Sequence, residues 1–132
     1  MRELDVCNQK QLDKFVKGCN VIVHAGTPFK LEVTDPQKEL YIPTITGTRN
    51  LLRAIKNSDS LTRVIFLASI AAWNTSFPLT PPIYHANHIF SEADTPYFSE
   101  NDHPYAQAKF LANKEVNKYI QKHRDLKFEI VS

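Results

Sequence analysis

A tyrosine and a lysine lie four residues apart in the segment HPYAQAKF (103–110), directly after a proline. Residues at this spacing share one face of a helix, so Tyr105 and Lys109 lie one turn apart if the segment is helical. A free tyrosine has a pKa near ~10 and is a poor base at neutral pH, but a nearby ammonium group favours the phenolate. The pair therefore suits proton transfer to or from a carbinol oxygen while a hydride moves on the carbon.

Ser69 is the third residue of this candidate constellation. It ends the apolar run RVIFLAS (63–69), which predicts a buried strand. Active groups of open α/β sheets collect at the carboxyl ends of strands, so Ser69 is placed to bond and orient the same substrate oxygen. A Y-x-x-x-K pair by itself also fits the solvated face of any helix, and the serine favours the catalytic interpretation over that one.

Alternating strand and helix patterns run along the whole chain and must position these residues. The apolar runs predict strands at 2–6, 21–25, 63–69 and 127–132, and the periodic segments predict helices at 8–18, 36–57 and 104–123. The order β-α-β-α-β-α-β indicates an α/β fold with a parallel sheet and right-handed crossovers.

Local signals mark the ends of the two longer helices. Thr34-Asp35-Pro36 is an N-cap signal with proline in the first turn, and Pro43 predicts a kink or restart inside that helix. Gly47 allows close backbone approach on one helix face. Asn101-Asp102 predicts the cap of the last helix.

Composition sets limits on the function classes that the chain can serve. The 132 residues are 42% hydrophobic and 23% charged, with a formal net charge of +2, which is too weak and mixed to favour nucleic-acid binding. No apolar run reaches the length of a membrane span, and the first residues lack the apolar stretch of a signal peptide. A cytoplasmic location is therefore expected.

The long irregular stretch 70–102 carries most of the aromatic residues and several histidines. Its aromatic side chains fit a wall over a substrate pocket and fit equally well the internal packing of a long loop; they are Trp73, Phe77, Tyr84, Phe90, Tyr97 and Phe98. His85, His88 and His103, with Glu92 and Asp94, lack a strict ligand pattern, so no metal site is predicted. The basic residues after Lys109 are expected on the solvated face of the last helix; they are Lys114, Lys118, Lys122 and Arg124.

Four segments together resemble a known enzyme family. They follow one another in family order over nearly the whole chain and read GCNVIVHAGTPF, DPQKELYIPTITGTRNLLRA, RVIFLASIAAW and YAQAK. In these segments the chain resembles the extended short-chain dehydrogenases/reductases of the epimerase/dehydratase superfamily, close to the dihydroflavonol reductase and cinnamoyl-CoA reductase branch.

The resemblance implies a set of site residues. The family's catalytic serine, tyrosine and lysine fall on Ser69, Tyr105 and Lys109, and the last two also contact the cofactor. Its adenine-side aspartate falls on Asp5, and the backbone that lines the cofactor falls on Ala25, Gly26 and Thr27. The implied cofactor is NADP or NAD, with NADP favoured.

The sequence also departs from the family's pattern. Leu67 and Ala68 stand where members often carry hydroxyl residues before the serine, and Thr46 stands where they often carry asparagine. The chain has three glycines, at 18, 26 and 47, and no G-x-x-G-x-x-G turn of the kind that holds a pyrophosphate at a helix N-terminus.

These departures shape the expected fold. We expect residues 1–132 to form the central part of one NAD(P)-binding domain, from its third to its sixth strand. The fold class is then a partial Rossmann-like, doubly wound parallel sheet in a three-layer αβα arrangement, truncated at both ends. Residues 21–132 should keep a three-stranded sheet, with 2–6 displaced because the neighbouring strands of a 3-2-1-4-5-6 order are missing.

The expected function is NAD(P)-dependent reduction of a carbonyl or oxidation of an alcohol by an incomplete chain. Tyr105 would act as acid and base, Lys109 would tune it and bind ribose, and Ser69 would orient the carbonyl of a small substrate. The alternatives are a non-catalytic fragment or module that needs a second polypeptide for cofactor binding, and a nucleotide-sugar epimerase or dehydratase. A homodimer through helices 36–57 and 104–123 is a further expectation. A serine hydrolase is disfavoured because Ser69 lies in ASIAA and not in a G-x-S-x-G elbow.

Overall fold

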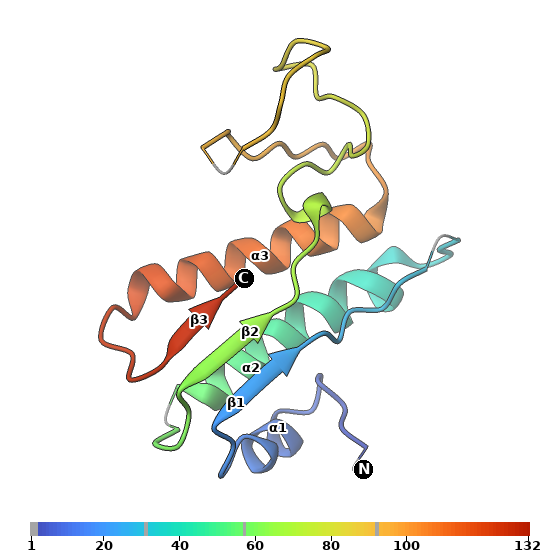
Figure 1. The fold of residues 1–132 in the computed structure, drawn as a ribbon. Helices are drawn as coiled ribbons and strands as arrows, with labels where there is room; N and C mark the ends of the chain where they lie inside the picture. Colours follow the sequence, from blue (N-terminus) through green and yellow to red (C-terminus); the bar gives the residue numbers. More distant parts are fainter. Residues whose placement is uncertain (1–2, 31, 57, 92) are drawn as a thin grey trace.

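Three short parallel strands form a single sheet at the centre of the computed structural model (Figure 1). The strands follow the chain in the order β1 (Val21–His24), β2 (Arg63–Phe66) and β3 (Glu129–Val131). The model describes residues 3–30, 32–56, 58–91 and 93–132. A parallel sheet in which order follows sequence requires a crossover between each pair of strands, and helices supply both crossovers.

Two long helical segments cover one face of this sheet. Figure 1 shows α2 behind β1 and β2, and α3 running alongside it toward β3. The helical segments are α1 (Gln9–Phe15), the π-helix η1 (Gln37–Thr46), α2 (Gly47–Ile55), the short 3-10 helix η2 (Ile70–Ala72) and α3 (Pro104–Lys122). The predicted α/β class with parallel strands and helical crossovers is therefore confirmed.

The strand register separates a covered face from an open face. Ile22, Val64 and Ile130 pair across the three strands and point toward α2 and α3, where Val64 is fully buried. The neighbouring row is more exposed: Val23 is 59% and Val131 is 44% exposed. Within the described residues the second helical layer of a three-layer arrangement is not formed, because α1 packs against α2.

The N-terminal segment does not join the sheet. Among the described residues of the predicted strand 2–6, residues 3–6 have no strand structure; residue 2 lies outside the described residues. Val6 instead packs on Gly47, where an added Cβ would lie 2.8 Å from Val6 Cγ2. The Asn50 side-chain amide donates to the Val6 and Cys7 carbonyls at 3.3 and 3.0 Å. The expected displacement from the sheet is thus observed, and Gly47 provides the expected close approach.

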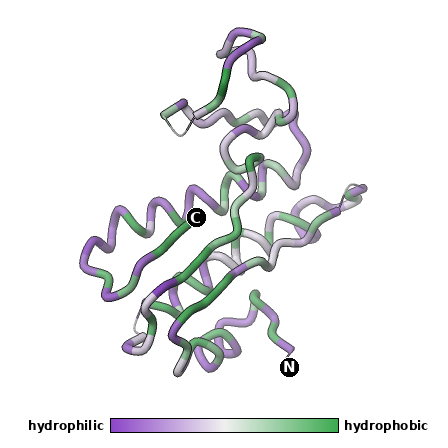
Figure 2. Tube along the Cα trace, in the orientation of Figure 1, coloured by the Kyte–Doolittle hydropathy of each residue, from purple (hydrophilic) through white to green (hydrophobic). Residues whose placement is uncertain are grey.

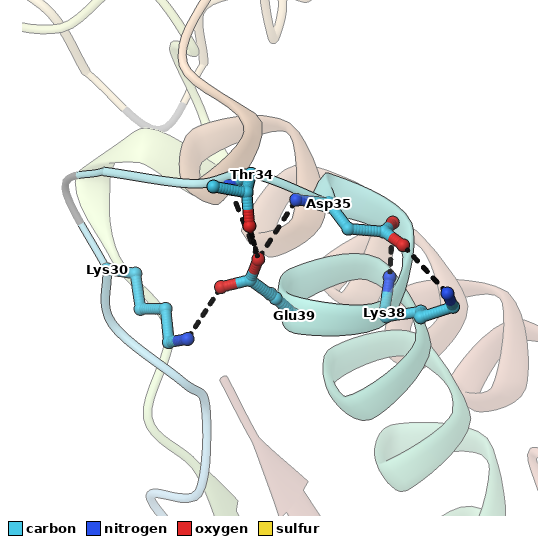
Figure 3. A network of polar contacts seen from close by, with 5 residues as sticks. All are labelled: Lys30, Thr34, Asp35, Lys38 and Glu39. Atoms are coloured by element: carbon cyan, nitrogen blue, oxygen red, sulfur yellow. Dashed lines mark hydrogen bonds and ion pairs between the residues drawn. The ribbon is translucent and has the colours of Figure 1, made fainter.

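A polar network fixes the start of η1 (Figure 3). The Asp35 carboxylate accepts from the Lys38 N–H at 3.1 Å, as an N-cap residue does, and Glu39 reaches back to accept from the Asp35 N–H at 2.9 Å. Glu39 also accepts from the Thr34 hydroxyl and pairs with Lys30 at 2.6 Å. The predicted cap at Thr34-Asp35-Pro36 therefore forms through the Asp35 side chain.

Pro43 lies inside the helical segment, as the sequence indicated, and changes its geometry. It has no N–H to donate to the residue four positions earlier, and residues 37–46 adopt the wider π geometry. The Gly47 N–H bonds to the Pro43 and Thr44 carbonyls, and regular α-helix begins there. The predicted restart thus takes the form of a change from π-helix to α-helix.

A long connection between η2 and α3 extends beyond the carboxyl end of β2 (Figure 1). Its two ends are tied together by a bridge between Asn74 and Tyr97 and by Asp102, whose carboxylate accepts from the Thr75 and Ser76 hydroxyls. The predicted cap of α3 by Asn101-Asp102 is therefore wrong, because Asp102 is engaged with the loop. The α3 cap is His103.

Figure 2 shows mainly hydrophobic residues along β1 and β2 and a mixture of hydrophilic and hydrophobic residues along the helices. In α1, Leu12 and Val16 are buried while Phe15 is 46% exposed. In α3, Ala112 and Val116 are buried. Among the described helices, none is long and apolar enough to cross a membrane.

Candidate active site

Lys109 is a buried cation at the carboxyl end of the sheet. It lies on the second turn of α3, where its residue is 9% exposed. Its Nζ donates to the Leu67 carbonyl at 2.7 Å and to the Thr27 hydroxyl at 3.4 Å. Burial lowers the pKa of Lys109 below its usual value of 10.5. Two oxygens from the loops after β1 and β2 thus fix the position of this ammonium group.

Tyr105 lies one helical turn before Lys109, as the spacing predicts. Its N–H donates to the His103 ring nitrogen Nδ1 at 3.1 Å, which places Tyr105 in the first turn of α3. The tyrosine ring meets Phe29 edge to face, with ring centroids 5.0 Å apart. Phe29 therefore positions the phenol from the loop that follows β1.

Ser69 lies three residues beyond the end of β2, because the hydrogen-bonded strand stops at Phe66 and not at residue 69. Its hydroxyl oxygen caps η2 by accepting from the Ala71 N–H at 3.3 Å. The helix η2 packs against α3. Ser69 is therefore held at the start of η2, which packs against α3, the helix that carries Tyr105. The strand β2 is shorter than predicted.

The predicted cofactor-lining segment Ala25–Thr27 directly follows β1. The Thr27 N–H donates to the Ala25 carbonyl at 3.1 Å and turns the chain away from the sheet. A Cβ built on Gly26 would meet the His24 ring at 3.6 Å, an ordinary contact. Thr27 is the member of this segment that the structure connects to Lys109.

Asp5 lies in the turn before α1. Its carboxylate accepts from the Cys7 N–H at 2.8 Å, and its own N–H donates to the Gln11 side chain at 2.9 Å. The next residue, Val6, lies 4.0 Å from the Cβ built on Gly26. The predicted adenine-side residue is thus an exposed turn residue whose chain neighbour borders the segment after β1.

His24 and Phe29 are site residues that the sequence reasoning missed. His24 shares a small cavity of about 30 Å³ with Thr27, Lys109 and Asn113, and its ring packs on Phe66 at 5.5 Å. Burial, followed by the charge of Lys109, lowers the pKa of His24 below 6.5. The available signal was strand alternation, because His24 shares the inward face with Ile22.

Ile70, the residue after Ser69, lines a larger hollow of about 490 Å³. Three of the six predicted wall residues line it together with polar groups, and the lining includes Ile70, Trp73, Asn74, Phe77, His88 and Phe90. The buried Trp73 Nε1 has no hydrogen-bond partner among the described residues. Two of the three remaining aromatic residues pack on other rings: Tyr84 stacks on His88, and Phe98 lies against Phe110.

The histidines of the loop take part in other contacts. His88 bonds to Asp94 at 3.0 Å and meets the His85 ring edge to face. In the described part of the chain, no group of three or more histidine, cysteine, aspartate or glutamate side chains is placed to hold a metal ion.

The polar groups at the carboxyl end of the sheet fit one end of a dinucleotide. A fixed ammonium, a threonine hydroxyl and a phenol one turn away can bond the hydroxyls of a ribose. The glycines do not add a phosphate cradle. Gly18 (φ 76°) forms the turn after α1, and Gly47 is covered by Val6.

Comparison with known proteins assigns the chain to a family. The model of the NAD dependent epimerase/dehydratase family matches residues 1–131. The chain belongs to this family. The predicted family resemblance is thereby confirmed, and the relatives fall in the predicted branch.

Two curated relatives are plant reductases. The chain is 35% identical over 111 residues to a cinnamoyl-CoA reductase of Medicago truncatula, which covers 83% of this chain and 33% of the relative. It is 28% identical over 122 residues to a putative anthocyanidin reductase of Ginkgo biloba, which covers 90% of this chain and 35% of the relative. The chain therefore spans about a third of the length of these relatives.

A solved structure confirms the fold. The Gre2 protein of Candida albicans in complex with NADPH is 28% identical and superposes with a TM-score of 0.76 over 96% of this chain and 39% of that chain. The three-stranded sheet and its helices therefore correspond to part of a Rossmann-fold reductase.

Proposed function

We propose that this chain supplies the proton-transfer residues of an NADP-dependent carbonyl reductase. The observation that carries the proposal is the buried Lys109 ammonium, which Leu67 and Thr27 hold one helical turn from Tyr105. Catalytic groups of open α/β sheets gather at this end of the strands. The family match and the reductase relatives support the same reaction class.

Each residue has a role that follows from its contacts. Tyr105 would donate a proton to the substrate oxygen and regain it, and Lys109, one helical turn further along α3, would support this transfer with its positive charge. The Ser69 hydroxyl oxygen accepts from the Ala71 N–H, which leaves its hydrogen for a substrate carbonyl oxygen. Phe29 packs on the tyrosine ring and restricts its movement.

The proposed cofactor is NADP, which is bound in the Candida albicans neighbour. A bound nicotinamide would supply the hydride. Tyr105 and Lys109 would hold the ribose, the Ala25–Thr27 backbone would line the cofactor, and Asp5 would contact the adenine side. NAD remains the alternative nucleotide, and the choice is left to the binding experiment below.

The proposed substrate is a carbonyl compound with an apolar, aromatic body. The support is the hollow that Ile70, the residue after Ser69, helps to line: Trp73, Phe77 and Phe90 also line it, and the buried Trp73 N–H lacks a partner among the described residues. An apolar pocket with few polar groups is typical of sites for small organic ligands. The long loop would thereby provide substrate contacts and not only its own packing.

The test measures the rate of NADPH oxidation with an aromatic aldehyde. It compares the unchanged chain with two variants, each of which has one tyrosine replaced. Tyr105→Phe removes the proposed acid and should reduce the rate about 10²–10⁴-fold, the usual contribution of a positioned acid or base. Tyr119→Phe, the same change further along α3, should leave the rate within about twofold. Equal rates for Tyr105→Phe and the unchanged chain would rule out the proposed role of this tyrosine.

A second candidate is a module without activity of its own that becomes competent when another polypeptide covers the sheet. The open face and the outer edge of β1 favour it, because strands of parallel sheets are ordinarily buried on both faces. The two candidates differ in a simple observation. The module binds NADPH only in the presence of its partner, whereas the reductase proposal requires binding by the chain itself.

A further inference from the structure

A second hollow, of about 270 Å³, lies between α2 and α3 and is lined mainly by charged side chains. It is distinct from the candidate active site: Lys118 lies nine residues beyond Lys109, roughly 14 Å along the helix at about 1.5 Å per residue. The polar residues of this α2–α3 groove are Arg49, Arg53, Glu115, Lys118, Tyr119 and Lys122.

The cations form two facing rows. Arg49 and Arg53 are four residues apart on α2, and Lys118 and Lys122 are four residues apart on α3. Residues at this spacing share one side of a helix, and α2 packs against α3. Both rows therefore border the same hollow.

The positive charge of the groove is largely uncompensated. Glu115 pairs with Arg49 at 2.8 Å, and this contact lowers the pKa of Glu115. Within the described ranges, Arg53, Lys118 and Lys122 have no carboxylate at ion-pair distance. Arg53 also borders a neighbouring hollow with Asp13 and Asp59, but its hydrogen-bond partner is the Asn50 side chain at 3.5 Å.

Tyr119 is the uncharged polar residue of the groove. The Tyr119 hydroxyl oxygen is buried and makes no hydrogen bond to any described residue. Tyr119 lines the same hollow as the two basic rows.

We propose that the α2–α3 groove binds a soluble multivalent anion of the phosphate type. Guanidinium groups bind phosphate oxygens through paired hydrogen bonds, and lysine adds point charges. The hollow of about 270 Å³ is large enough to admit a small multivalent anion in place of several waters. A second copy of the chain fits less well, because a twofold contact through this groove brings like charges together.

The test measures binding of inorganic tripolyphosphate by titration calorimetry at fixed ionic strength. The triple variant Arg53→Gln, Lys118→Gln, Lys122→Gln should weaken binding at least tenfold. The matched control Lys10→Gln, Lys14→Gln, Lys17→Gln makes the same change in net charge around α1 and should bind like the unchanged chain. Amide shifts in an NMR titration should be confined to α2 and the second half of α3.

Three outcomes would overturn the proposal. The unchanged chain fails to bind tripolyphosphate, or both triple variants weaken binding equally, which would indicate net charge alone. The third is that anionic phospholipid vesicles bind through these residues while soluble tripolyphosphate does not, which would indicate a membrane surface. Because the readout uses no nicotinamide or aldehyde, failure here leaves the proposed reductase function unaffected.

Discussion

The two faces of the sheet differ although the same three strands form both. On the covered face, Ile22 is 5% exposed and Val64 is fully buried beneath the helices. On the open face, Val23 is 59% exposed, and the Arg63–Glu129 ion pair bridges β2 and β3 at 2.7 Å. Alternate residues of one strand thus lie in different environments.

This difference shows what an apolar run establishes. The run VIVHA predicts a strand that is buried on both faces, and its residue types are equally apolar on either side. Within the described residues, helices cover one of these faces. The open face therefore carries apolar residues that suit a covered face, although no helix of the described residues covers it.

The largest expected effect separates two neighbouring residues of β1. Ile22→Ala removes a buried side chain and should lower the free energy of unfolding by about 2–5 kcal/mol, because it leaves a cavity in the core. Val23→Ala, one residue on, should cost less than about 1 kcal/mol. Urea unfolding of the two variants measures the difference, and equal losses would show that the open face is packed in solution.

A smaller effect concerns His24, which lies on the covered face. Its folded pKa is lowered, so the unfolded chain takes up a proton below pH 6.5 that the folded chain resists. Stability should therefore fall as the pH drops through 6.5, by at most about 1.4 kcal/mol per pH unit for one proton.

The control for this effect is His24→Asn, which keeps a polar side chain without a charge. Urea midpoints measured between about pH 7.5 and pH 5.5 should change less in this variant than in the unchanged chain. The same pH dependence in both proteins would place the proton uptake elsewhere.

The smallest effect is expected for Glu39, which lies outside the sheet at the start of η1 (Figure 3). Hydrogen bonds from Lys30 and Thr34 lower the pKa of Glu39 to about 2. Its stabilising effect is present above about pH 4.5 and is lost as the pH falls toward 2. Glu39→Gln should lower the melting temperature slightly at neutral pH, because exposed ion pairs contribute little. A difference that persists at low pH would contradict this origin.

The fold was predictable where local pattern decides it. The apolar runs at 21–25, 63–69 and 127–132 identified the three strands, and the Asp35-Pro36 signal marked the start of η1. The cap of α3 was not predictable, because Asp102 is engaged by the hydroxyls of Thr75 and Ser76, far away in sequence. The early end of β2 at Phe66 likewise depends on where its neighbour β1 ends.

The candidate site was predictable in part. The i, i+4 spacing predicted Tyr105 and Lys109 one turn apart on a helix, and the family pattern indicated Thr27, whose hydroxyl Lys109 contacts. The Leu67 contact to Lys109 uses a backbone carbonyl, which side-chain types do not reveal. The positions of His24 and Phe29 depend on strand pairing and loop folding, and spacing along the chain does not show either.

The most direct test of the proposed reductase site is the thermal unfolding of the chain with and without millimolar NADPH and NADH. A ligand that binds the native state stabilises it, by about 2.7 kcal/mol at a hundred times its dissociation constant. We expect NADPH to raise the melting temperature of the unchanged chain and Lys109→Met to lose most of this increase. A cooperative transition that neither nucleotide moves would contradict the proposed site.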